Sequence, residues 1–163
     1  MLVAAVLWSA LAQDPVENPE YKGWKPFKPG SSVTYKFTRE GSPQAGEQKM
    51  TLKSIDDQEA VVQTEFSMAG RSAGKPMDRT IKAKLGAADP RPELKDGPEE
   101  EIEVGGKMLK CRTRELEKKL DSGKTMKVKY WGHEDIPGMA AKVETSTDGG
   151  MRITMVATQW EKK

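Results

Sequence analysis

The chain has 163 residues, of which 32% are charged, and its formal net charge is +2. This size and balance are typical of one well-solvated globular domain, and they exclude a polyanion binder, which would show a concentrated basic excess. The only cysteine, Cys111, excludes an internal disulfide bond.

The first segment, residues 1–12, is uncharged and has the layout of a secretory signal peptide. Its apolar run ends in the small residues Ala10 and Ala12, and the sequence turns polar at Gln13. This layout predicts cleavage after about Ala12 and export of the rest, periplasmic or secreted. A buried N-terminal strand or helix is the alternative. Because a membrane span needs about 20 apolar residues, we expect no transmembrane span in the mature chain.

The next segment, residues 13–30, is rich in proline, and we expect an irregular strap ahead of a single β domain over residues 31–163. The strap interleaves aromatic residues with lysines, a composition that could bind a nucleic acid, a glycan or an acidic surface. Alternatively, Trp24 and Phe27 plug one end of the fold while the lysines face water. Nucleic acid is not expected for an exported protein, so Trp24 and Phe27 are kept as candidates for a surface contact.

Beyond the strap, apolar and polar residues alternate with a period of two. Each such run predicts a strand with one apolar and one polar face. The runs cover residues 33–38, 50–53, 62–68, 81–85, 101–104, 109–114, 126–130, 142–144 and 151–158. Nine runs of this kind predict an all-β protein whose sheet is mainly antiparallel, with one face toward water.

The connections support this interpretation. Gly105-Gly106 predicts a two-residue hairpin, and residues 86–98 form one long loop rich in proline, glycine and charge. Residues 107–120 could instead be helical, although we favour a strand for the first half. No convincing amphipathic helix is available to cover the sheet. We therefore expect a meander sheet of about nine strands that curves round its own core as an open half-barrel.

Methionine is frequent in and beside the predicted strands. Its flexible side chain suits an adaptable cavity for apolar ligands, although it is also ordinary core filling. The late strands and the aromatic pair between them would line such a cavity. The candidate ligand-binding residues are Met126, Val128, Tyr130, Trp131, Met151, Ile153 and Met155.

Two other features could carry chemistry. The triplet His133-Glu134-Asp135 contains the only histidine, but consecutive side chains point in different directions, and no second histidine exists to complete a metal site. A solvated loop is the expected state of this triplet. Cys111 has basic neighbours, but the alternation puts them on the opposite face, so a buried thiol is expected. We therefore expect no catalytic residue, no metal and no cofactor.

The segment Tyr130-Trp131, then Ile136-Pro137-Gly138, then Lys142-Val143-Glu144 resembles a late hairpin in one group of proteins. These are small, mostly uncharacterised exported bacterial proteins with a LolA/LolB-like curved half-barrel. The entry Gly23-Trp24 to Phe27-Lys28-Pro29-Gly30-Ser31 is also similar to secreted bacterial proteins of unknown function. The resemblance implies a curved half-barrel in an exported protein.

Three functions remain open. The first is a non-catalytic binding module for a lipid or another apolar small molecule, which predicts a dry concave cavity of several hundred Å³. The second is a structural protein that interacts with an envelope protein, which predicts an exposed apolar patch or a long unpaired edge. The third and least favoured is a hydrolase or metal enzyme at His133, which predicts an acid within hydrogen-bond reach of that side chain in a cleft.

Overall fold

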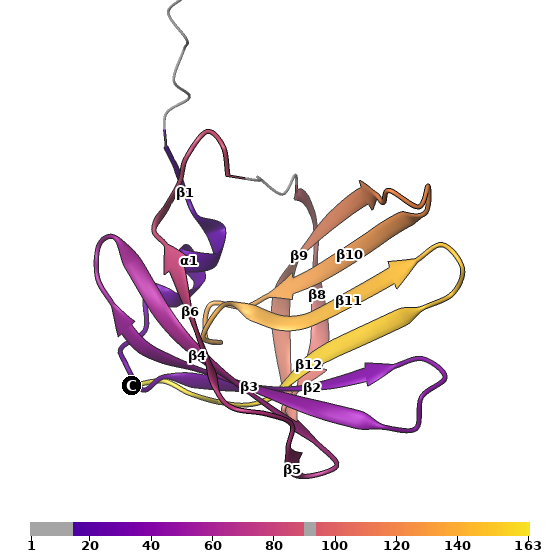
Figure 1. The fold of residues 1–163 in the computed structure, drawn as a ribbon, viewed down its shortest axis with the longest axis horizontal. Helices are drawn as coiled ribbons and strands as arrows, with labels where there is room; N and C mark the ends of the chain where they lie inside the picture. The colour runs from indigo at the N-terminus through magenta and orange to yellow at the C-terminus, as the bar shows by residue number, and fades with distance from the viewer. Residues whose placement is uncertain (1–14, 90–93) are drawn as a thin grey trace, which may run out of the picture.

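The computed structural model describes residues 15–89 and 94–163. The predicted signal segment, residues 1–12, lies outside them. The described residues form an all-β fold around one antiparallel sheet (Figure 1), which confirms the predicted fold class. The strands of this sheet are β2 (Ser32–Arg39), β3 (Ala45–Ile55), β4 (Glu59–Met68), β5 (Arg71–Ser72), β6 (Met77–Lys82), β8 (Lys95–Val104), β9 (Lys107–Lys119), β10 (Thr125–Gly132), β11 (Ala140–Thr147) and β12 (Arg152–Glu161).

The sheet is an open meander. Nine strands lie in the order β5-β4-β3-β2-β12-β11-β10-β9-β8, and β6 also pairs with β4. Nearly all neighbours follow one another in the chain; the exception is β12, which pairs with β2 and so joins the two halves of the meander. Because β8 and β5 do not pair in the described part of the chain, the sheet is not closed into a barrel, as predicted. Figure 1 shows it curling around α1 (Pro19–Trp24).

The helix α1 was not predicted, because it lies in the segment expected to be an irregular strap. Asn18 caps the helix by accepting a hydrogen bond from the Glu20 amide, and Pro19 occupies the first turn, where its missing N–H costs nothing. Just before it, β1 (Val16–Glu17) pairs with β7 (Lys84–Leu85). The helix has only six residues, so no apolar periodicity could mark it.

Part of the core lies between α1 and one face of the sheet, which we call the inner face. Tyr21 and Trp24 of the helix are 3% and 1% exposed, and Phe27, just after it, is 6% exposed. Trp24 and Phe27 are therefore buried and not a surface contact, because they belong to the core cluster with inner-face residues of β2, β3, β4 and β6. Their sheet partners in the core are Val33, Tyr35, Leu52, Ala60, Val62 and Ile81.

The β8–β9 hairpin packs on the opposite, outer face. Its tip at Gly105 lies against Trp160 and the Thr158 carbonyl of β12, so an added Cβ at Gly105 would meet them at 2.9 and 2.8 Å. Gly105 and Gly106 both have positive φ angles, 57° and 75°, which is the two-residue turn that the sequence predicted. Alternate hairpin residues join the core: Ile102, Val104, Leu109 and Cys111.

Two details differ from the predicted elements. The long loop ends earlier than residue 98, because β8 begins at Lys95 and continues through an irregularity in register between Asp96 and Glu99. Residues 107–119 are one continuous strand, so the helical alternative for this segment is wrong. Among the residues described, we find no helix with the length and apolarity that crossing a membrane requires.

Candidate functional site

A row of mostly apolar residues runs across the inner face where α1 does not cover it. Its members are directly opposite one another on six adjacent strands, from β10 to β4, and cross-strand partners share a face. We call it the inner row: Tyr130, Val143, Met155, Phe37, Gly46 and Met68. Phe37, Tyr130, Val143 and Met155 are half-buried, and Met68 is 36% exposed.

A second row runs beside the first, one pair further from α1. It contains Val128, Thr145 and Ile153. Val128 is buried, whereas Thr145 and Ile153 are half-buried. Of the two rows, only Met155 packs against the core cluster. Apart from the buried Val128 and Gly46, the two rows make an apolar surface that the protein's own core leaves open. Figure 1 shows strands β10 to β12 extending away from α1.

The tip of the Phe37 ring lies over Gly46, its partner on β3. A Cβ placed on Gly46 would be 2.0 Å from Cζ of that ring. Any larger residue at position 46 would therefore push the ring out of the row. The pairing of glycine with an aromatic residue keeps this part of the surface continuous.

Five of the seven predicted ligand-binding residues lie on this face: Met126, Val128, Tyr130, Ile153 and Met155. Trp131 does not, because it follows Tyr130 and so points to the outer face, where it is 4% exposed. Met151 lies just before β12 and is 38% exposed. The sequence missed Phe37, Val143 and Met68. Their period-two alternation was visible, but the strand order that brings them beside β10 was not.

Trp131 is held in a polar network on the outer face. Its Nε1 donates to Glu100 at 2.7 Å, and Lys129 Nζ donates to the other oxygen of Glu100 at 2.7 Å. The ammonium groups of Lys129 and Lys142 lie 4.7 and 4.6 Å from the centre of a Trp131 ring. The hydrogen bonds from Lys129 and Trp131 lower the pKa of Glu100. The network fixes the β8–β9 hairpin to β10 and leaves the indole no open face.

The corner at residues 133–139 is a structural turn. Nδ1 of His133 accepts a hydrogen bond from the Asp135 amide at 3.2 Å and lies 4.0 Å from a carboxylate oxygen of Asp135. Asp135 is paired with Lys162, whose hydrogen bond lowers the pKa of that carboxyl. Ile136 is fully buried, and the Gly138 amide donates to the Gly23 carbonyl of α1. The Pro-Gly turn therefore locks β10 and β11 onto the helix.

The arrangement around His133 gives no support to an enzyme there. The imidazole is engaged by a backbone amide, and its acidic neighbour is engaged by a lysine. Across the described ranges 15–89 and 94–163, no group of three or more His, Cys, Asp or Glu side chains is placed to hold a metal. Cys111 is buried, and burial raises the pKa of its thiol, as a core residue requires.

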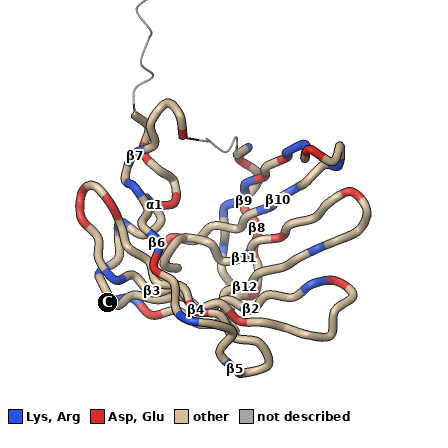
Figure 2. Tube along the Cα trace, viewed as in Figure 1, with Lys and Arg blue, Asp and Glu red and all other residues tan. Residues whose placement is uncertain are grey.

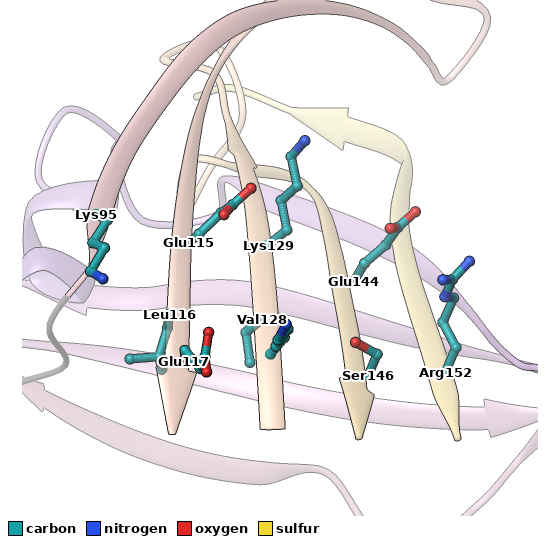
Figure 3. Close-up of a pocket in the computed structure, with 10 residues that line it drawn as sticks. Lys95, Glu115, Leu116, Glu117, Val128, Lys129, Glu144, Ser146 and Arg152 are labelled. Carbon is teal, nitrogen blue, oxygen red and sulfur yellow. The ribbon is translucent and has the colours of Figure 1, made fainter. Parts of the chain in front are cut away.

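Two hollows lie on the surface of the described residues. One, of about 260 Å³, lies on the outer face of β9 to β12 and is lined mostly by charged residues, among them Glu115, Lys129 and Glu144 (Figure 3). The other, of about 490 Å³, lies mainly over Thr34, Lys49 and other outward residues of β2 to β4. Neither hollow is a dry cavity on the inner face.

The edges of the sheet are poor templates for another strand. At one edge, β8 carries Gly97-Pro98, an irregular register and three consecutive glutamates. At the other, β6 carries the charged residues Asp78, Arg79 and Lys82 and is exposed except at Ile81. Such features blunt an edge against pairing. Charges of both signs are distributed along the described part of the chain (Figure 2).

Comparisons with known proteins identify a fold and no family. No family model and no curated protein matches the sequence. The hypothetical protein CT021 from Chlamydia trachomatis is similar in structure, with a TM-score of 0.54 and 11% identity over 91% of this chain and 94% of that chain. MucB of Pseudomonas aeruginosa, solved in complex with MucA, has a TM-score of 0.51 and 12% identity over 88% of this chain and 54% of that chain.

A second structure, of MucB in complex with MucA(peri), has a TM-score of 0.51 and 13% identity, and it covers 90% of this chain and 54% of that chain. This chain thus spans about half the length of MucB. At these identities the likeness shows a shared fold. It agrees with the half-barrel that the LolA/LolB-like resemblance implied, whereas membership of that group stays a prediction.

Proposed function

We propose that this protein is an exported, non-catalytic binding module that holds an apolar ligand against the open half of its inner face. The observation that carries the proposal is the contrast within that face. Under α1, apolar side chains are almost fully buried. Along the inner row, Tyr130, Val143 and Phe37 stay half-buried and lie outside the core cluster. A continuous apolar surface left open on a folded domain is typical of a binding site.

An apolar segment of an envelope protein is favoured over a lipid or other apolar small molecule. A small ligand is usually enclosed over most of its surface, and neither hollow described above offers such an enclosure on the inner face. An open sheet face instead suits a ligand that brings its own flat apolar surface. The similarity to MucB, whose structure was solved in complex with MucA, supports a protein partner by analogy of fold. Export rests on residues 1–12.

The test is the binding of an apolar fluorescent probe, N-phenyl-1-naphthylamine, to the purified chain. We expect the probe to bind, and Val143→Lys to weaken binding at least tenfold, because it places a charge within the inner row, between Tyr130 and Met155. Thr154→Lys is the matched control: Thr154 precedes Met155 on β12 and shares the outer face with its partner Glu144. We expect this control to bind like the parent protein.

A second variant guards against a loss of folding. Met68→Lys alters the exposed end of the inner row, where a lysine is tolerated, and should weaken probe binding several-fold without a change in thermal unfolding. If the probe does not bind, or if the inner-row and control variants weaken it equally, the open inner face is not the binding surface and the proposal fails.

A further inference from the structure

An arginine flanks the inner row at each end. Arg114 of β9 is directly opposite Tyr130, and Arg71 of β5 is directly opposite Met68. A third arginine, Arg39, is opposite Ile153 in the neighbouring row. The apolar surface therefore has a positively charged border on the same face.

These guanidinium groups have little internal compensation. Among the residues that the structure describes, neither Arg39 nor Arg71 has a carboxylate within 4.0 Å. Arg114 pairs with Asp96 at 3.0 Å, but the Asp96 side chain is 84% exposed, so water screens that pair and a competing carboxylate could replace it. A ligand that brings carboxylates to the border would complement it.

The helix α1 shows on the same face how such a ligand can be held. Its aromatic residues pack on the sheet, and its Glu20 forms an ion pair with Arg79. Arg79 is opposite Val62 of β4, so its side chain also belongs to the inner face. A helix that packs aromatic residues on the sheet and bears an acid paired with an inner-face arginine is thus already present beside the open half.

The backbone of the sheet favours a helical occupant over an extended one. The strands that carry the inner row, from β10 to β4, each have a hydrogen-bonded strand on both sides. Their main-chain groups are used, so an extended peptide lying across them would leave its own N–H and C=O groups without partners. A helix satisfies these groups internally and needs only side-chain contacts.

The length of the row sets the length of the helix. Tyr130 and Met68 are separated by five strand spacings, or about 24 Å at about 4.8 Å per spacing. A helix rises about 1.5 Å per residue, so about 16 residues cover that distance. The arginines lie one strand beyond each end.

We propose that the open half of the inner face binds an amphipathic helix of a partner protein, with an apolar stripe of about 16 residues and acidic residues at both ends. This inference rests on the proposed function and names its ligand class. A membrane surface is the competing occupant, and vesicle binding in the experiment below distinguishes it from a helix.

The experiment uses two fluorescein-labelled peptides with the same amphipathic helical centre and either glutamates or lysines at both ends. Anisotropy is measured with the full chain at physiological salt. We expect the glutamate-ended peptide to bind at least tenfold more tightly. The double variant R71E/R114E should abolish or reverse that preference, and the milder R71Q/R114Q should reduce it. Arg152 lies opposite Ser146 on the outer face, and R152E should leave the preference unchanged.

Each other result overturns the inference in a distinguishable way. If both peptides bind equally and Val143→Lys weakens the binding of both, the proposed function is supported and the proposed preference for acidic ends is wrong. If neither peptide binds but naphthylamine does, the helix is wrong. If phosphatidylglycerol vesicles bind in an Arg71- and Arg114-dependent way while the peptides do not, a membrane is the occupant. If neither peptides, probe nor vesicles bind, the proposed function fails as well.

Discussion

The two halves of the inner face share strands β2 to β4, yet they differ in what lies on them. Under α1, Trp24, Phe27 and Ile136 seal the sheet, and the core there is 6% exposed or less. Beyond α1, Phe37, Tyr130 and Val143 remain half-buried. Stability is therefore concentrated in the covered half, and the open half keeps surface available for a ligand. Substitutions in the two halves should separate folding from binding.

The largest difference is expected between Trp24→Ala and Phe37→Ala. Removing the fully buried indole leaves a cavity and should cost about 3–5 kcal/mol of unfolding free energy. Removing the half-buried ring of Phe37 should cost about 1–2 kcal/mol, since it forfeits less buried area. Urea unfolding followed by circular dichroism measures both. Equal losses would contradict the division of the inner face into a sealed and an open half.

Glycine substitutions sharpen the same contrast. A Cβ at Gly23 would lie 2.9 Å from the Gly138 carbonyl oxygen, which is backbone and cannot move freely. Gly23→Ala should cost about 1–3 kcal/mol through overpacking. Gly46→Ala should cost less, since its Cβ would meet the end of the Phe37 ring, which can rotate toward the open side. Thermal unfolding should rank the pair in that order, and the reverse ranking would mean that the ring is fixed.

The two halves should also differ in how stability depends on pH, because each contains a tyrosine with a raised pKa. Burial raises the pKa of Tyr35 well above its ordinary value, and burial together with Glu20 raises the pKa of Tyr130. The unfolded chain releases such protons near pH 10, whereas the fold retains them. The stabilisation from the protonated tyrosines is therefore fully present below about pH 10 and is lost as pH rises through the folded pKa. For Tyr35 the free energy of unfolding should fall by about 1.4 kcal/mol per pH unit.

Unfolding in urea between pH 9 and 11 checks this expectation. Tyr35→Phe should remove most of the alkaline loss, because it removes the buried phenol. Tyr130→Phe should remove less, since this side chain is only half-buried. An unchanged alkaline loss in Tyr35→Phe would place its cause elsewhere.

The smallest effect is expected on the outer face. The pKa of Glu100 is lowered by its hydrogen bonds from Lys129 and Trp131, so the stabilisation is present above the unfolded pKa and is lost as pH falls through the folded pKa. The Glu100 side chain is 34% exposed, so Glu100→Gln should cost less than about 1 kcal/mol. Acid unfolding measures this cost. Naphthylamine binding should not change. A change would show that the outer face influences binding on the inner face.

Much of this architecture could be predicted because local alternation determines it. The period-two pattern marked the strands, Gly105-Gly106 marked a hairpin, and the alternation in β10 placed Val128 and Tyr130 on one face. The same alternation puts Trp131 on the other face, so grouping it with Tyr130 as a ligand residue joined two neighbours that cannot share a surface. The buried position of Cys111 followed from its place in an alternating run.

The rest depends on contacts between distant segments, which alternation does not contain. Phe37 and Met155 are neighbours only because β12 pairs with β2, and this pairing fixes the inner row. The six-residue α1 is too short to show a helical period, although Asn18-Pro19 is a start signal that could have been used. The role of His133 as a turn residue required the positions of the Asp135 amide and Lys162.

The most direct test of the open inner face is an NMR titration of the chain labelled at its methionine methyl groups. Met68, Met126 and Met155 lie on the inner face, whereas Met108 is 65% exposed near the tip of the β8–β9 hairpin. On addition of the glutamate-ended amphipathic peptide, we predict shifts at Met68, Met126 and Met155 and none at Met108. Shifts at Met108 without shifts at the three inner methionines would contradict the assignment of the binding surface.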